Sequence, residues 1–243
     1  MGGVTVLIPT LNERENVDPL LEQLIAIRER SELYFDILFI DSASPDGTGQ
    51  KVLEWKEKGG VDLLQLERNI GLAGAVLRGA AHTNAEFLLV MDADLSHPPE
   101  KVVELLRPVV SGEKDMMIGS RYAEGGTTQD WPFRRRLSSR IATLPALCFC
   151  SVSDPLAGFF ALRRDLLLGL PGSVPGFKIG LAVLAHYGCD LRVGELPIEF
   201  RDRDFGESKM GKAVIAAYLW QLVGICRDKI TNIATRPSDT SRG

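Results

Sequence analysis

The stretch Phe87-Leu88-Leu89-Val90-Met91-Asp92-Ala93-Asp94 carries the strongest structural signal in the chain. An apolar run that is too short for an independent helix is typical of a strand buried on both faces. Asp92 and Asp94 end it two positions apart, so on an extended backbone their side chains point the same way. Two such carboxylates can bind one hard divalent cation, Mg²⁺ or Mn²⁺, whose other positions fill readily with phosphate oxygens. An isolated Asp-x-Asp can also simply cap a turn, and the neighbouring segments must decide between the two readings.

Composition predicts a globular domain whose chemistry is local. The chain has 243 residues, a hydrophobic share of 45% and a net charge of -4, so it can build a core and has no overall nucleic-acid signature. We expect one domain over residues 1–235 and a disordered tail over residues 236–243. The four cysteines lack zinc-type pairing, and reduced thiols indicate a cytoplasmic location. The N-terminus runs directly into a strand, so no signal peptide is expected.

Strand and helix patterns alternate along the chain. Strands are expected at residues 4–8, 34–40, 61–66, 87–91, 115–120 and 191–200, and residues 154–164 are expected to form a turn and a further strand. The strand at residues 191–200 contains Pro197, which favours a sheet edge. Pro9 is expected to end the first strand, because proline lacks the donor that a ladder needs. The alternation predicts an α/β fold with a mainly parallel central sheet and helices on both faces.

Four polar loops are expected at the carboxyl edge of this sheet, where ligands bind in open α/β folds. They are residues 9–13, 41–48, 92–97 and the segment from Arg121 onward. Carboxylates for a base or ribose, a carboxylate pair for a metal, and basic side chains for phosphates suit a nucleoside diphosphate. Gly71 and Gly74 do not form a dinucleotide fingerprint, and no P-loop Gly-Lys-Ser/Thr occurs.

Six motifs in order, between about residues 4 and 212, resemble family 2 glycosyltransferases with the GT-A fold, and among them the dolichyl-phosphate (polyprenyl-phosphate) mannosyltransferases. The motifs are PTLNEREN at 9–16, SPDGT at 44–48, DADLSHPP at 92–99, GSRY at 119–122, DPLAGFFALRR at 154–164 and GESK at 206–209. The resemblance implies a metal-dependent, inverting transfer of mannose from GDP-mannose to a polyprenyl (dolichyl) monophosphate. Two alternatives stay open: a UDP-glucose-dependent polyprenyl-phosphate glucosyltransferase, and a sugar-nucleotide-binding subunit without turnover.

The resemblance also implies roles for individual residues. The guanosine would be held by Pro9, Leu11, Glu13 and Asp41. The metal and the diphosphate would lie at Asp92, Ala93 and Asp94, with Ser96 as a further metal ligand. Phosphates would contact Arg121, Arg135, Arg203 and Lys209. Among these, the catalytic residues would be Asp94, Arg121, Arg135 and Arg203.

Three positions qualify the resemblance. Leu11 replaces a family aromatic residue that could stack on the base, and Ser42 replaces the second Asp of the usual Asp-Asp pair. Arg135 is selected from Arg134, Arg135 and Arg136 only by spacing.

The acceptor phosphate is anionic at pH 7, so the nucleophile needs guiding arginines more than a general base.

A lipid acceptor requires a surface beside a membrane, and we expect peripheral association with its cytosolic face. The helix expected from Arg134 to Cys150 can lie on a membrane, or it can be a solvated basic turn followed by a core helix. The apolar run of residues 213–226 is shorter than a bilayer requires. A membrane-spanning partner subunit could complete the anchor. The segment from Arg203 to Lys209 is expected to be a mobile flap that orders on the donor.

Overall fold

A seven-stranded sheet forms the centre of the molecule, in the order β3-β2-β1-β4-β6-β5-β7. The computed structural model describes residues 2–128, 133–147, 150–171, 178–201, 218 and 220–224. The strands are β1 Val4–Thr10, β2 Asp36–Asp41, β3 Val61–Gln65, β4 Phe87–Val90, β5 Met116–Ser120, β6 Phe160–Arg163 and β7 Val193–Pro197. Neighbouring strands pair parallel, except that β6 runs antiparallel to β4 and β5. The mainly parallel sheet is therefore confirmed, with the proline-bearing strand β7 at its edge.

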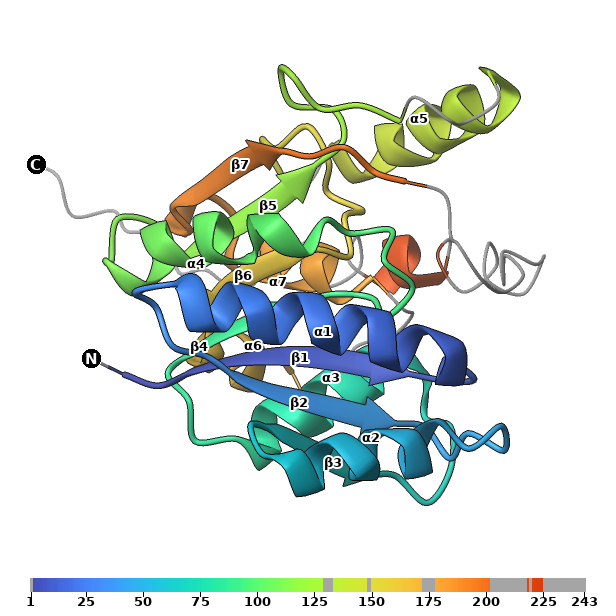
Figure 1. Ribbon diagram of the computed structural model, residues 1–243. Coiled ribbons are helices and arrows are strands. Elements are labelled where there is room, and N and C mark those ends of the chain that lie inside the picture. The colour runs from blue at the N-terminus through green and yellow to red at the C-terminus, as the bar shows by residue number, and fades with distance from the viewer. Residues whose placement is uncertain are drawn as a thin grey trace, which may run out of the picture.

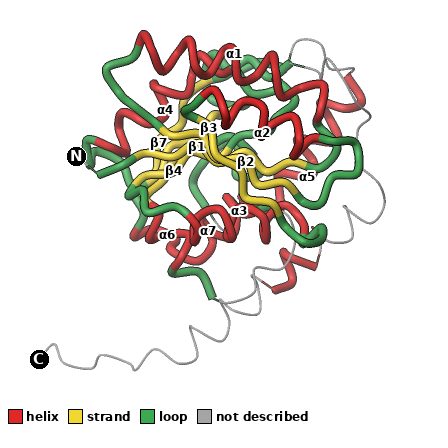
Figure 2. Tube along the Cα trace, turned by 60° about the horizontal axis from the view of Figure 1, so that its bottom comes forward, coloured by secondary structure: helices red, strands yellow, loops and turns green. Residues whose placement is uncertain are grey.

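Helices cover both faces of the sheet (Figures 1 and 2). One face carries α1 Arg14–Arg30, α2 Thr48–Lys58 and α4 Val102–Val110, and the other carries α3 Gly71–His82, α6 Arg164–Leu168 and α7 Ile179–Tyr187. Two short 3₁₀ turns, Pro99–Lys101 and Gly188–Asp190, precede α4 and follow α7. The stripe of α1 that faces the sheet is fully buried and repeats with helical periodicity at Val17, Leu20, Leu21 and Leu24.

The prediction that Pro9 ends the first strand is wrong. Pro9 lies inside β1 and pairs with Ile40 of β2. The Leu7 carbonyl accepts a hydrogen bond from the Met91 N–H on the β4 side, and the Thr10 carbonyl accepts one from the Ser42 N–H on the β2 side. The backbone groups of odd-numbered residues of β1 therefore point toward β4, and those of even-numbered residues point toward β2. The nitrogen of Pro9 therefore faces β4, whose pairing with β1 has already ended at Val90. A missing donor is harmless there.

Helix α5, Phe133–Leu147, lies beyond the sheet near the carboxyl ends of β5 and β7 (Figure 1). Thr143 and Ala146 are buried, but four apolar side chains on this helix are exposed by 40% to 59%: Leu137, Ile141, Leu144 and Leu147. The helix therefore packs one side against the domain, where Ala146 joins a buried cluster with Leu156 and Leu181, and presents a second, apolar face to its surroundings. Within the described residues, no helix has the length and apolar content that crossing a membrane requires.

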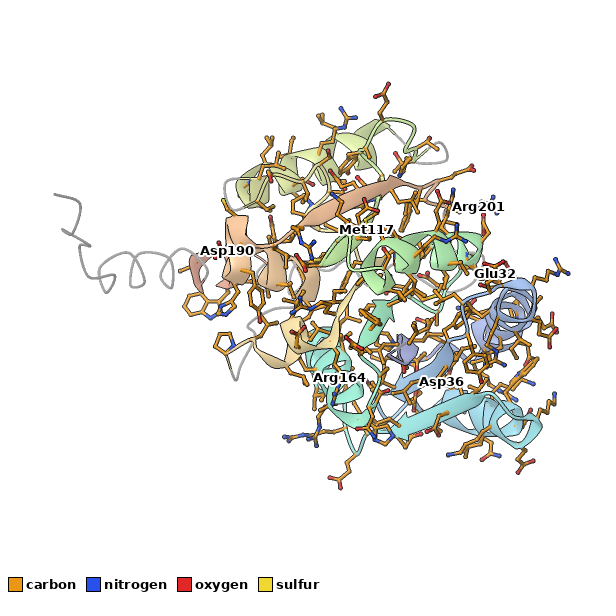
Figure 3. All side chains as sticks on the ribbon, turned by 90° about the vertical axis from the view of Figure 1, so that its left-hand side faces the viewer. Glu32, Asp36, Met117, Arg164, Asp190 and Arg201 are labelled. Atoms are coloured by element: carbon orange, nitrogen blue, oxygen red, sulfur yellow. The ribbon has the colours of Figure 1, made fainter. Side chains whose placement is uncertain are left out.

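The amino-terminal edge of the sheet carries a charged network around Asp115. This edge faces the viewer in Figure 3, where Asp36, the first residue of β2, is labelled. Arg192 donates to both carboxylate oxygens of Asp115, at 2.9 Å from Nε and 2.8 Å from Nη2. Arg163 adds a third contact at 3.3 Å. The network joins the amino ends of β5 and β7 to the end of β6, on the edge opposite the polar loops.

Candidate active site

Strained backbone marks the carboxyl edge of the sheet. Asn12, Ala43 and Leu95 have positive φ angles of 57°, 57° and 59°. They lie in the loops after β1, β2 and β4, respectively. A left-handed residue other than glycine costs about 1–2 kcal/mol and persists mainly where the surrounding structure enforces it, often at functional sites.

The loops after β1 and β2 are tied together by hydrogen bonds to the start of α1. Backbone N–H groups of one loop donate to side chains of the other in three pairs: Asn12 to Ser44 Oγ at 2.9 Å, Glu13 to Thr48 Oγ1 at 3.0 Å and Arg14 to Asp46 Oδ2 at 3.1 Å. These side chains satisfy donors at a helix start that have no partner within the helix. Burial raises the pKa of Asp46, but hydrogen bonds from Thr48 and Arg14 outweigh it and lower the pKa below its ordinary value.

Asp41 is the buried junction of three loops. Its carboxylate accepts hydrogen bonds from Thr10 Oγ1 at 3.2 Å, from the backbone N–H of Ser44 at 3.1 Å, from the Ser44 hydroxyl, and from Gln65 Nε2 at 2.6 Å. Its side chain is fully buried, and Ser42 beside it is buried as well. The predicted guanosine residue Asp41 therefore also holds the loop ends in place. Gln65, at the end of β3, was not predicted, because nothing in a lone strand-end glutamine indicates its partner.

The other residues predicted for the guanosine lie at the end of β1 and in the loop that follows it. Pro9 is buried in β1, and Leu11 and Glu13 follow it as half-buried residues. Asn16 Nδ2 donates to Glu13 Oε2 at 2.7 Å. Asn16 Oδ1 is the one buried side-chain nitrogen or oxygen without a hydrogen-bond partner in the described part of the chain. A group of this kind costs free energy unless a ligand or water satisfies it.

The carboxylates Asp92 and Asp94 follow β4 as predicted. Asp94 is buried, and its Oδ1 accepts hydrogen bonds from the Ser96 N–H at 3.1 Å and the Ser96 hydroxyl at 2.6 Å. The side chain of Asp92 is 37% exposed, and the intervening Ala93 is buried. The described residues hold no cluster of three or more His, Cys, Asp or Glu side chains that could enclose a metal. A cation here would take its remaining ligands from phosphate or water, which is how Mg²⁺ is commonly bound.

The surroundings of Asp92 fit such a cation. A Cβ added to Gly158 would lie 3.7 Å from Asp92 Oδ2 and 3.3 Å from His97 Cε1. The absence of a side chain at Gly158 therefore leaves space beside the carboxylate. Carboxylate and hydroxyl oxygens are also the ligands that hard divalent cations prefer.

His97 fixes the backbone of Asp92. Its Nδ1 accepts the Asp92 N–H at 3.0 Å, and its ring stacks on Phe159 with a centroid distance of 5.1 Å. Burial lowers the pKa of His97, although Asp92 and Asp94 oppose that effect. The neutral ring must then carry its proton on Nε2, which lies 3.9 Å from Asp92 Oδ2. His97 belongs to the DADLSHPP motif, but the sequence alone indicated no role for it.

Arg121 lies at the end of β5 and forms an ion pair with a buried carboxylate. Its Nε and Nη2 donate to the two oxygens of Asp154 at 2.7 and 2.8 Å, and its backbone N–H adds a bond at 3.1 Å. Its Cζ lies 5.5 Å from the centroid of the Phe200 ring. Burial lowers the pKa of Arg121, but Asp154 raises it further, so that the net shift is upward. Arg121 therefore stays charged.

The turn before β6 supports all of these groups. Asp154 binds Arg121, the Leu156 carbonyl accepts from Lys178 Nζ at 2.8 Å, and Gly158 lies against His97 and Asp92. Lys178, just before α7, was not predicted as a site residue. The sequence could not place it, because its neighbours come from distant segments. The structure thus brings Asp92, Ala93, Asp94, Ser96 and Arg121 together at one edge, with Lys178 beside them.

Three predicted residues cannot be placed in the same way. The backbone of Arg135 lies in α5, but its side chain is outside the described part. Arg203, Lys209 and the predicted flap between them lie outside the described residues altogether.

The model of glycosyl transferase family 2 matches residues 5–169. The chain belongs to glycosyl transferase family 2. Dolichol-phosphate mannosyltransferase of Pyrococcus furiosus is 38% identical to this glycosyltransferase over 222 residues, which are 89% of this chain and 61% of that protein. The Saccharomyces cerevisiae protein of the same name is 35% identical over 228 residues, with 90% of this chain and 85% of that protein covered. The predicted resemblance is confirmed.

Solved structures confirm the GT-A fold of this glycosyltransferase. Glucosyl-3-phosphoglycerate synthase of Mycobacterium tuberculosis, in complex with Mn²⁺ and UDP-glucose, gives a TM-score of 0.70 at 20% identity, covering 93% of this chain and 79% of that one. Mannosyl-3-phosphoglycerate synthase of Rubrobacter xylanophilus gives 0.68 at 20% identity, covering 100% and 78%.

Proposed function

We propose that this glycosyltransferase moves mannose from GDP-mannose to a polyprenyl monophosphate of the dolichyl type, with inversion at the anomeric carbon. The observation that carries the proposal is the similarity, over 89% and 90% of the chain, to two enzymes named dolichol-phosphate mannosyltransferase. The donor is inferred from the motifs at residues 9–16 and 44–48, whose loops are tied together at the carboxyl edge.

Asp92 and Asp94, with Ser96, would hold Mg²⁺ or Mn²⁺. The Ser96 hydroxyl donates its proton to Asp94, which leaves its lone pairs for an ion. When bound, the ion would supply positive charge against the diphosphate of the departing nucleotide. The Mn²⁺ in the M. tuberculosis synthase supports this choice of metal, because that enzyme shares the fold.

The protein's own residues would orient the acceptor. Its phosphate already carries negative charge at neutral pH, so attack needs positioning rather than proton removal. Arg121 suits this task, because Asp154 holds its guanidinium in one orientation. Arg135, Arg203 and Lys209 remain predicted phosphate contacts, and Pro9, Leu11, Glu13 and Asp41 remain the predicted guanosine site.

A membrane surface fits the exposed apolar groups of two segments that a hydrogen bond joins. On α5 the exposed residues are Leu137, Ile141, Leu144 and Leu147, and the helical residues near the C-terminus add Trp220 and Val223, exposed by 72% and 56%. The hydroxyl of Tyr218 donates to the Ala142 carbonyl at 2.6 Å and so joins the two segments. The acceptor's hydrocarbon could stay in lipid while its phosphate reaches the site. We propose peripheral binding to the cytosolic face, where a membrane-spanning partner could assist.

A donor panel tests the proposal. The 243-residue protein is incubated with Mn²⁺, extracted polyprenyl phosphate and either GDP-[³H]mannose or UDP-[³H]glucose. Label should enter the lipid fraction from GDP-mannose only, and GDP should inhibit more strongly than UDP. Transfer from UDP-glucose alone would establish the glucosyl alternative. Nucleotide binding without transfer from either donor would indicate the non-catalytic subunit.

A further inference from the structure

Lys178 enters the site from the face of the sheet that α7 covers, and both of its ends are fixed. Its backbone is held by Gln221, a buried residue of the C-terminal helical segment. Gln221 Nε2 donates to the Lys178 carbonyl at 2.9 Å, and Gln221 Oε1 accepts the Lys178 N–H at 3.3 Å. At the other end, Nζ donates to the Leu156 carbonyl at 2.8 Å. A flexible side chain is thereby held in one place beside the proposed reaction centre.

The charges around Lys178 are those of the site. Burial and the neighbouring Arg121 lower the pKa of Lys178 to about 8, whereas Asp92 and Asp154 act to raise it. The ammonium group therefore stays protonated in most molecules at pH 7. Both carboxylate oxygens of Asp154 already accept hydrogen bonds from Arg121, through Nε and Nη2. Two cations, Arg121 and Lys178, are thus kept within electrostatic range of each other, and an anion binding near both would offset their repulsion.

We propose that Lys178 binds a phosphate oxygen of the substrates. This inference rests on the proposed function, because it assigns a further contact within the same site. A lysine ammonium is a compact point charge that suits phosphate oxygens, and desolvation strengthens the interaction. The phosphate belongs either to the diphosphate of the nucleotide donor or to the monophosphate of the acceptor. Gln221 is the residue that positions Lys178.

Binding of anions can be measured without turnover. Lys178→Met keeps the aliphatic length and removes the charge, and Lys178→Arg restores it. Lys56→Met is the matched control, because Lys56 pairs with Asp62 near the opposite edge of the sheet. Calorimetry with Mn²⁺ and either inorganic pyrophosphate or GDP should show affinity falling by about 10- to 100-fold in Lys178→Met. Affinity should recover at least partly in Lys178→Arg and stay unchanged in Lys56→Met.

A second arm distinguishes the two sources of phosphate. If pyrophosphate and GDP bind Lys178→Met as they bind the wild type, while KM for a short-chain polyprenyl phosphate rises about tenfold, Lys178 contacts the acceptor. Loss of pyrophosphate affinity assigns it to the donor. Wild-type affinities and an unchanged KM in a folded Lys178→Met protein would overturn the proposal and leave Lys178 with a structural role.

Two further measurements keep the test decisive. If Lys178→Met does not fold, an amine-reactive reagent is applied to the wild type, and modification is mapped by mass spectrometry. Pyrophosphate with Mn²⁺, or the polyprenyl phosphate, should protect Lys178 and leave Lys56 unprotected; protection by neither anion would overturn the proposal.

Binding of pyrophosphate does not depend on which sugar or base the donor carries. Failure of the proposed function would appear separately, as a wild-type protein that does not transfer mannose from GDP-mannose.

Discussion

Arg121 holds Asp154 through both prongs of its guanidinium, although the Asp154 side chain is fully buried and that of Arg121 is only 12% exposed. Removing one partner of a buried ion pair leaves the other charge uncompensated. Asp154→Ala should therefore lower the free energy of unfolding by about 3–5 kcal/mol, measured by urea denaturation. Asp165→Ala is the control, because its ion pair with Arg163 lies at the surface. It should lose no more than about 1 kcal/mol. Equal losses in the two variants would contradict the structural role of Asp154.

Asp94→Asn should suppress transfer without unfolding the protein. The amide keeps the shape of the side chain, including an oxygen that can accept from Ser96, but it removes the charge that a divalent cation needs. We expect a loss of about 100-fold or more in transfer rate at saturating Mn²⁺, with an unchanged thermal midpoint. Asp62→Asn, near the opposite edge, should retain full activity. If Asp94→Asn transferred mannose equally well with and without a chelator, the metal assignment would be wrong.

Acid should weaken the link between β5 and β7. Hydrogen bonds from Arg192 lower the pKa of Asp115 below its ordinary value of 3.8, against the opposing effect of burial. A carboxyl whose folded-state pKa is lowered contributes stability above its unfolded-state pKa and loses it as the pH falls through the folded-state pKa. Urea unfolding of Asp115→Asn should consequently depend less on pH than the wild type between about pH 5 and pH 2. The two proteins should converge at the acid end. Parallel pH profiles would rule out this contribution.

Ala43 tests whether the site edge is strained. It is exposed and has a φ of 57°, so glycine removes a steric cost of about 1–2 kcal/mol and adds a smaller entropic cost. Ala43→Gly should leave stability unchanged or raise it by about 1 kcal/mol. Ala26→Gly, inside α1, should lower it by about 1 kcal/mol. Denaturation midpoints that fall equally in both variants would argue against the left-handed backbone.

Vesicle binding tests the membrane surface. Replacing Ile141 and Leu144 by Ser removes exposed apolar groups of α5, and replacing Arg134, Arg135 and Arg136 by Ser removes charge. Each basic residue near an anionic surface contributes about 1 kcal/mol, so sedimentation with anionic vesicles at low salt should fall in both variants. Only the residual binding of the arginine variant should be insensitive to salt. Equally poor binding of the wild type to anionic and neutral vesicles would refute the surface assignment.

Much of the sheet and part of the site could be predicted, because they depend on short stretches. The apolar run before Asp92 indicates a buried strand by itself, and successive parallel strands bring their following loops to one edge. Pro9 was misjudged because its tolerance depends on where β4 stops pairing. The antiparallel direction of β6 could not be deduced, since a short apolar strand has the same pattern in either direction. Lys178 and Gln65 were missed because their roles depend on residues far away in the sequence.

The reversed direction of β6 has a consequence for how this site can diversify. The strands around it leave the sheet at the carboxyl edge, but β6 enters there, so the turn of residues 154–158 arrives between the loops that follow β4 and β5. Its residues contact Arg121, Lys178 and His97, and they precede Phe160, the first residue of β6 that pairs with β4 and β5. Substitutions in this turn at positions other than Asp154 can therefore reshape the space beside Arg121 and Lys178 without disturbing strand register. Among relatives with different acceptors, we expect the sequence at this edge to differ more in the turn that precedes β6 than in the loops that follow β4 and β5.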